Sequence, residues 1–173
     1  MGKVILYITT SLDGYIAKED GDISWLNKYN INSYGYDEFL NNTDTIVMGS
    51  KTFENISSFK EWPYKNIKTY VMTSRIIQAD SHVEFVPGNL QNLIPTLKES
   101  SENNIYLVGG SDLVKSFIEE KLLEEIKLFI VPEVLGKGIP LFYKYQTQVI
   151  FKPIHIESYV NNMVQIHYVL NYQ

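Results

Sequence analysis

Residues 105–118, IYLVGGSDLVKSFI, hold a complete strand, turn and helix in one short stretch. Ile105 to Val108 is a compact apolar run, which is typical of a strand buried on both faces. The apolar positions that follow gather on one face of a helix with 3.6 residues per turn: Leu113, Val114, Phe117, Ile118 and Leu122. A buried strand that leads directly into an amphipathic helix is the repeating unit of a parallel α/β sheet.

Similar apolar runs recur along the chain. They predict further strands at Val4 to Ile8, Thr45 to Met48, Lys68 to Met72, Val83 to Val86 and Ile126 to Val131. Segments whose apolar residues have helical spacing lie between several of these strands, and one of them is Leu90 to Lys98. There Pro95, which lacks an N–H group and clashes inside a helix, predicts a late start near Asn92.

The end of the chain changes character. Two strand-like runs, Val149 to Tyr159 and Met163 to Leu170, flank Asn161-Asn162, and asparagine tolerates the positive φ of a tight hairpin. We therefore expect an α/β fold with a doubly wound, mainly parallel sheet, helices on both faces and an antiparallel C-terminal hairpin. Residues 1–173 are expected to form a single domain, because single domains commonly have this length.

Composition narrows the classes of function. A formal net charge of −5 argues against a nucleic-acid partner, since such proteins need clustered basic residues. The chain has no cysteine, and His82, His155 and His167 are too scattered to predict a metal site. No run is long and apolar enough for a membrane span or an export signal, so we expect a soluble cytoplasmic protein without a membrane partner.

Three polar or glycine-rich stretches follow predicted strands, where an open α/β sheet binds its ligand. Val108-Gly109-Gly110-Ser111 lets the backbone approach a phosphate at a helix N-terminus, or it is a tight turn with Ser111 as N-cap. In Gly49-Ser50-Lys51-Thr52 the lysine can meet a phosphate, or it is simply solvated while Ser50 or Thr52 caps a helix. This stretch lacks the spacing of a nucleoside-triphosphatase P-loop.

Thr73-Ser74-Arg75 is the third stretch and contains the only arginine of the chain. A guanidinium beside two hydroxyls suits a phosphate monoester, which in a dinucleotide is the 2′-phosphate of NADP. The alternative is a surface arginine at the end of a strand.

Substrate-binding candidates are Thr9, Asp13, Trp25 and Asp37. Asp13 follows the first strand and can orient a substrate amide, although Asp13-Gly14 is also a common turn pair. Asp37 is either a substrate-binding acid or a charge at a helix N-terminus. The glycine-containing segment Leu135 to Phe142 either flanks a ligand or only turns the chain.

In order and spacing, the stretches resemble the dihydrofolate reductase superfamily. The nearest branch is akin to the reductase domain of the bacterial bifunctional riboflavin-biosynthesis deaminase-reductase. The resemblance is carried by residues 11–17, SLDGYIA, by Ser24-Trp25, by residues 49–53, GSKTF, by Thr73-Ser74-Arg75, by Gly109-Gly110 and by residues 132–138, PEVLGKG. It covers nearly the whole chain.

The resemblance implies an NADPH-dependent reductase that transfers hydride to a small heterocycle such as a 5-amino-6-ribosylaminouracil phosphate. Alternatives are dihydrofolate reductase activity and a non-catalytic nucleotide-binding or interaction module. The expected NADPH contacts are Ile8, Ile16 and Ala17, which with Thr9 flank the nicotinamide; Gly49, Ser50, Lys51, Thr52, Thr73, Ser74 and Arg75 on the adenosine-phosphate side; and Val108, Gly109, Gly110, Ser111, Asp112 and Leu113 around the pyrophosphate. No catalytic residue is predicted. A small-molecule substrate and a homodimer are the expected partners.

Overall fold

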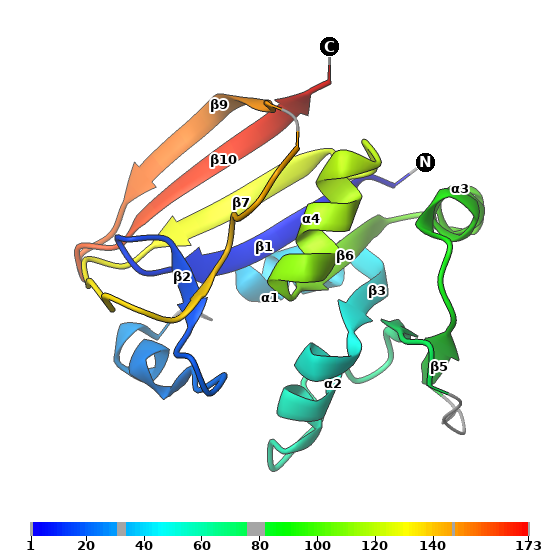
Figure 1. Ribbon diagram of the computed structural model, residues 1–173, viewed down its shortest axis with the longest axis horizontal. Coiled ribbons are helices and arrows are strands. Elements are labelled where there is room, and N and C mark those ends of the chain that lie inside the picture. The colour runs from blue at the N-terminus through cyan, green and yellow to red at the C-terminus, as the bar shows by residue number, and fades with distance from the viewer. Residues whose placement is uncertain (1, 31–33, 76–81, 147, 173) are drawn as a thin grey trace.

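The computed structural model describes residues 2–30, 34–75, 82–146 and 148–172 (Figure 1). The elements in chain order are β1 (Val4–Thr10), β2 (Tyr15–Ala17), the short 3-10 helix η1 (Ser24–Tyr29), α1 (Tyr36–Asn41), β3 (Thr43–Gly49), α2 (Ser50–Ser57), β4 (Lys68–Met72), β5 (Val83–Val86), α3 (Leu90–Ser100), β6 (Asn104–Gly109), α4 (Ser111–Glu119), β7 (Glu125–Ile130), β8 (Ile139–Pro140), β9 (Ile150–Ser158) and β10 (Val164–Asn171). No helix of these residues is long and apolar enough to cross a membrane.

One eight-stranded sheet runs in the order β5-β4-β3-β6-β1-β7-β10-β9. Its strands from β5 to β7 are parallel, while β10 pairs antiparallel with both β7 and β9. The predicted mainly parallel sheet and its antiparallel terminal hairpin are confirmed, with Asn162 at φ 62° in the turn. A second, two-stranded sheet pairs β2 with β8.

Side chains alternate between two apolar layers. Val4 and Leu6 of β1 pack with α3 and α4 on one face, whereas Ile5 and Tyr7 pack with η1, α1 and α2 on the other. Figure 1 shows α4 in front of the sheet and α1 behind it. Both faces are covered, as the continuous apolar runs of the strands require.

The predicted late start of α3 is wrong. The helix begins at Leu90, and Pro95 lies inside it. Asn89 caps the helix by accepting a hydrogen bond from the Gln91 N–H group at 2.9 Å, and Leu90, Ile94 and Leu97 are buried. Capping and burial of this face outweigh the single helical hydrogen bond that proline removes.

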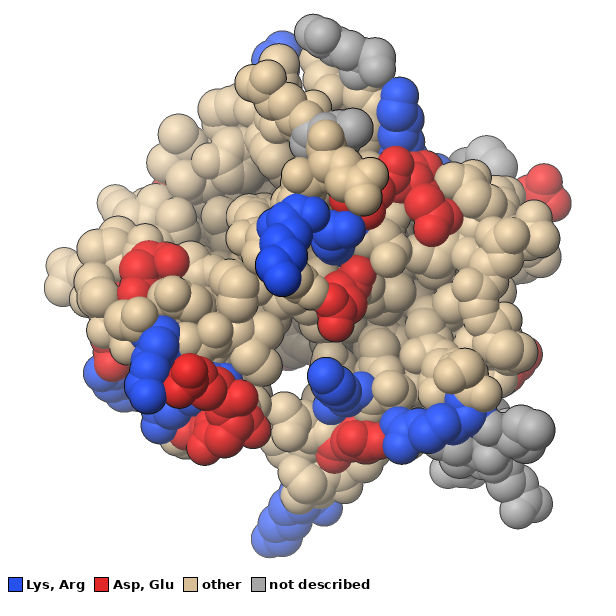
Figure 2. Space-filling view, in the orientation of Figure 1, with Lys and Arg blue, Asp and Glu red and all other residues tan. Residues whose placement is uncertain are grey.

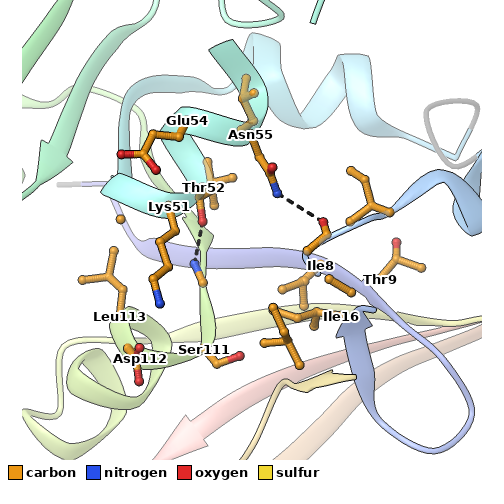
Figure 3. Close-up of a pocket in the computed structure, with 18 of the residues that line it drawn as sticks. Ile8, Thr9, Ile16, Lys51, Thr52, Glu54, Asn55, Ser111, Asp112 and Leu113 are labelled. Carbon is orange, nitrogen blue, oxygen red and sulfur yellow. Dashed lines mark hydrogen bonds between the residues drawn. The ribbon is translucent and has the colours of Figure 1, made fainter. Parts of the chain in front are cut away.

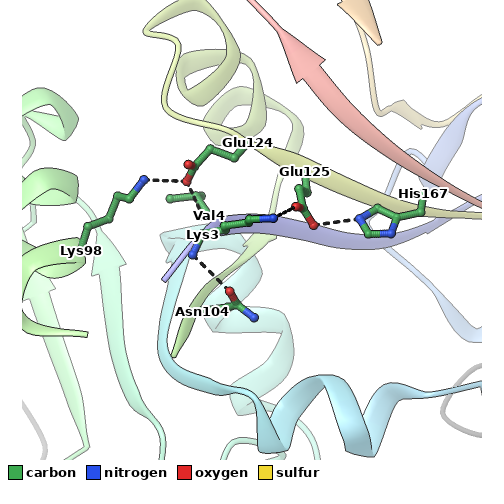
Figure 4. Close-up of polar contacts among 7 residues, drawn as sticks. All are labelled: Lys3, Val4, Lys98, Asn104, Glu124, Glu125 and His167. Carbon is green, nitrogen blue, oxygen red and sulfur yellow. Dashed lines mark hydrogen bonds and ion pairs between the residues drawn. The ribbon is translucent and has the colours of Figure 1, made fainter. Parts of the chain in front are cut away.

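An ion-pair cluster fixes the start of β1 (Figure 4). The Lys3 Nζ lies 2.5 Å and the His167 Nε2 2.8 Å from the Glu125 carboxylate, which joins β1, β7 and β10. Glu124 next to it accepts from the Val4 N–H group and from Lys98. Burial raises the pKa of Glu125, but the hydrogen bonds from Lys3 and His167 outweigh burial and leave the pKa below its usual value.

A carboxylate whose pKa falls on folding stabilises the protein above its unfolded pKa, and that contribution disappears as the pH falls through the folded value. Glu125→Gln should therefore lower the urea midpoint at neutral pH. The difference from wild type should shrink as the pH is lowered from neutral to well below the usual glutamate value of 4.5, because Glu125 then takes up its proton and its contribution disappears. Urea unfolding across this range tests the prediction, with exposed Glu157→Gln as the control. A difference independent of pH would contradict it.

Candidate functional site

A cavity of about 990 Å³ opens at the carboxyl ends of β1, β3 and β6 (Figure 3). These strands are neighbours in the sheet, so the segments that follow them meet at one edge. The cavity has three walls made of predicted site residues. They are Ile8, Thr9, Ile16 and Ala17 from β1 and β2; Gly49, Ser50, Lys51 and Thr52 at the start of α2; and Val108, Gly110, Ser111, Asp112 and Leu113 at the start of α4.

Two helix N-termini face this cavity without side-chain caps. Gly49 precedes α2 and Gly110 precedes α4, and neither helix has a capping hydrogen bond from a side chain. The capping alternatives for Ser50, Thr52 and Ser111 are therefore wrong. The Ser111 hydroxyl instead donates to the Pro140 carbonyl. The first-turn N–H groups stay available to an anion, which the positive end of a helix also favours.

Thr52 joins the two glycine-containing turns. Its Oγ1 accepts a hydrogen bond from the Gly110 N–H group at 3.0 Å, across the ends of β3 and β6. Gly109 before it has φ 119°, a conformation that favours glycine. Figure 3 shows Lys51 extending from α2 toward the first turn of α4. The cation and the first-turn N–H groups of both helices thus share one part of the cavity.

The segment Leu135 to Phe142 flanks the cavity. It contains β8, whose pairing with β2 brings Gly138, Ile139 and Pro140 into the lining. A Cβ atom on Gly138 would lie 2.3 Å from the Ala17 carbonyl oxygen, so this close backbone approach needs glycine. Of the two options left open by the sequence, the structure supports a ligand-flanking segment.

Four tyrosines line the cavity: Tyr7 of β1, Tyr36 of α1, Tyr64 before β4 and Tyr106 of β6. Tyr7, Tyr64 and Tyr106 are buried, so we call this part of the cavity its inner end. Nothing in the sequence marks these tyrosines as site residues, because aromatic residues in strands and helices are usually part of the core. Tyr7 and Tyr106 do donate to backbone, to the Tyr34 carbonyl at 3.1 Å and the Tyr7 carbonyl at 3.2 Å respectively.

Burial raises the pKa of each of the four phenols, so they remain protonated at neutral pH. The hydroxyl of Tyr36 also interacts with those of Tyr64 and Tyr106, and these interactions limit the rise of its pKa. The inner end therefore offers uncharged hydroxyl groups, which can donate or accept hydrogen bonds.

Three substrate candidates lie outside the cavity lining. The Asp13 carboxylate accepts from the Ser11 hydroxyl at 2.6 Å and from the N–H groups of Leu135 and Gly136, contacts that match the structural alternative. Trp25 is buried in the core beside α1. Asp37 is exposed in the first turn of α1, as expected for a charge at a helix N-terminus. Of the four, only Thr9 lines the cavity.

The stretch Thr73-Ser74-Arg75 lies after β4, outside the cavity lining, as does Gly109. The Arg75 guanidinium pairs with Glu54, a cavity residue on α2, and both side chains are more than half exposed. The Thr73 hydroxyl accepts from the Arg75 N–H group at 3.1 Å. The arginine therefore stands at the rim, beside the α2 wall. No group of three or more His, Asp or Glu among the described residues is placed to hold a metal ion.

The sequence model of the RibD C-terminal domain family matches residues 2–165, nearly the whole chain. The chain belongs to the RibD C-terminal domain family. Among its relatives, the uncharacterized protein YwjB of Bacillus subtilis is 35% identical over 170 residues, covering 96% of this chain and 97% of YwjB. The cavity described above is therefore a feature of a RibD C-terminal domain.

Solved structures agree with this family. A candidate riboflavin-biosynthesis protein from Shewanella sp. PV-4 is 29% identical with a TM-score of 0.89, over 98% of this chain and 99% of that one. The Thermotoga maritima diaminohydroxyphosphoribosylaminopyrimidine deaminase/5-amino-6-(5-phosphoribosylamino)uracil reductase gives a TM-score of 0.75 at 19% identity, over 98% of this chain and 57% of that one. Dihydrofolate reductase of Enterococcus faecalis, complexed with NADP(H), gives 0.71 at 19% identity, over 99% and 98%. The last two show the fold, which is the dihydrofolate reductase-like fold expected from the sequence.

The hydrogen bond from the Gly110 N–H group to the Thr52 hydroxyl should stabilise this RibD C-terminal domain. Thr52→Val keeps the shape of the side chain but leaves the partly buried Gly110 N–H group without its acceptor. The free energy of unfolding should therefore fall by about 1–2 kcal/mol. Thr52→Ser keeps the hydroxyl and should lower the free energy of unfolding by less. Urea unfolding of both variants measures the difference. Equal losses would show that the hydrogen bond contributes nothing measurable.

Proposed function

We propose that this RibD C-terminal domain is an NADPH-dependent reductase that acts on a small flat heterocycle. The observation that carries the proposal is the pair of uncapped helix N-termini, at α2 and α4, that open side by side into one cavity. Adjacent amide donors with a nearby lysine are the chemistry that a pyrophosphate requires. The cavity volume is also at the upper end of the range for small-molecule sites.

In this proposal Ser111, Asp112 and Leu113 in the first turn of α4 bind the pyrophosphate through backbone N–H groups, and Lys51 balances its charge. Ile8, Ile16 and Ala17 form an apolar wall for the nicotinamide, which supplies hydride when bound. The wall excludes water from the reacting face and orients the ring against the substrate. Arg75 and Ser74 at the rim bind the 2′-phosphate, so the Arg75 side chain exchanges its Glu54 partner for the cofactor.

The first substrate to test is a 5-amino-6-ribosylaminouracil phosphate, since the family supports a reductase of the riboflavin-pathway type. Dihydrofolate is the second, because the fold is shared with dihydrofolate reductase. The α1 carboxylate Asp37 is exposed and outside the cavity, which disfavours a pterin site built on that residue. A non-catalytic nucleotide-binding module is the rival function, and it predicts cofactor binding without turnover of any heterocycle.

NADPH should bind much more tightly than NADH in a calorimetric titration of the purified protein. Arg75→Ala should weaken NADPH binding about tenfold or more, because it removes a charge-assisted hydrogen bond to the 2′-phosphate, and should leave NADH binding nearly unchanged. Lys65→Ala is a matched control, since Lys65 is an exposed cation outside this cavity. Equal losses for both cofactors would refute the role of Arg75, and absence of binding of either cofactor would refute the proposal.

We also propose a homodimer through the edge of the sheet. β9 is the edge strand of the sheet beside β10, and its Ile154 and Ile156 are 53% and 64% exposed. Ile156, Ile166 and Leu128 form one apolar row across β9, β10 and β7. The face over β9 and β10 is largely free of charged side chains in Figure 2. An uncovered apolar edge strand favours pairing with a second copy.

Sedimentation equilibrium should show a dimer that Ile156→Lys converts to monomer, because the buried charge would have no partner. Val160→Lys is the control, since Val160 is fully exposed in the hairpin turn between β9 and β10. NADPH binding should survive both changes. A monomeric wild type, or a dimer that persists in Ile156→Lys, would refute this interface.

A further inference from the structure

The polar groups of the cavity are divided between its rim and its inner end. Its acidic residues are all exposed: Glu19, Asp20, Glu54 and Asp112. Three of them have partners near the surface, because Glu19 pairs with Lys137, Glu54 with Arg75, and Asp112 accepts from the Tyr143 hydroxyl. Among the described lining residues, the carboxylates therefore belong to the rim.

The inner end has phenol hydroxyls instead. Tyr106 is 4% and Tyr64 5% exposed, and the ring of Tyr106 lies 6.4 Å from that of Tyr36 and 6.1 Å from that of Tyr64. Each of the three hydroxyls affects the pKa of the other two. The Tyr106 hydroxyl donates a hydrogen bond to the Tyr7 carbonyl, so the Tyr106 oxygen can still accept a hydrogen bond from a neighbour. We call Tyr36, Tyr64 and Tyr106 the hydroxyl cluster.

We propose that the hydroxyl cluster recognises the polar edge of the substrate ring and selects an uncharged ring bearing carbonyl and N–H groups over a cationic one. The inference rests on the proposed function, because it assigns the substrate side of the same cavity. Tyr36 is the contact residue. Tyr64 and Tyr106 are positioning residues that hold its hydroxyl.

The physical reason is the cost of burying charge. A protonated ring at the inner end would lose water and meet no buried carboxylate among the described lining residues, whereas a carbonyl oxygen would meet a hydroxyl donor and a ring N–H would meet a hydroxyl acceptor. Phenols also keep their position, since each ring packs edge-on against another aromatic ring of the same cluster. The cluster is therefore a rigid, uncharged counterpart for a lactam edge.

Two pteridines that differ only at this edge test the proposal. Lumazine carries two carbonyl groups and is uncharged, while 2,4-diaminopteridine carries amino groups in their place and is more readily protonated. Affinities are measured by fluorescence titration, with and without NADP⁺. Wild type should prefer lumazine by about tenfold or more, and Tyr36→Phe should lower lumazine affinity about tenfold while changing diaminopteridine affinity little. The ratio separates recognition from a general loss of packing.

Tyr145→Phe is the matched control, because the Tyr145 hydroxyl is buried outside this cavity. It should leave both affinities unchanged, and thermal unfolding should show that Tyr36→Phe is folded. A preference for diaminopteridine, an equal effect of Tyr36→Phe on both probes, or no binding of either probe would overturn the proposal. The NADPH titration is independent: cofactor binding without lumazine binding refutes the hydroxyl cluster alone, and loss of both refutes the proposed function as well.

Discussion

The site depends on the parallel pairing of β3 with β6. Met48 pairs with Gly109 where the two strands end, so α2 and α4 begin next to each other. The bond from the Gly110 N–H group to Thr52 then holds the two turns together. The two positive helix ends gather on one side of the cavity, and this arrangement follows from the sheet rather than from either motif alone.

The same constraint explains why the helices lack side-chain caps. In most helices a hydroxyl or carboxylate before the first turn satisfies the first N–H groups. Here glycine occupies both cap positions, and the Ser111 hydroxyl at the start of α4 donates to the Pro140 carbonyl of β8. The serine links the two-stranded sheet of β2 and β8 to α4. The first turn of α4 therefore has no side-chain cap.

The rim and the inner end of the cavity have different electrostatic character. Exposed acids and bases at the rim are solvated, so their pairs contribute little to stability and can be exchanged for a ligand. The tyrosines at the inner end are buried in the aromatic layer around Phe39 and Tyr7, where a charge would be costly. A cofactor with phosphates at the open side and an uncharged ring at the closed side fits this division.

The sequence alone was enough to predict the class of fold. Apolar runs marked the strands of the main sheet and the Asn161-Asn162 turn marked the hairpin, because strand and turn preferences are local, whereas the short strands β2 and β8 carried no such signal. Local rules failed at Pro95 and at Ser111, where packing and a contact with β8 outweighed the intrinsic preference. Only the tertiary structure decided that Arg75 stands at the rim, that Asp13 fastens a loop and that four tyrosines share one cavity. These contacts join residues distant along the chain, and the sheet that brings them together has no local signature.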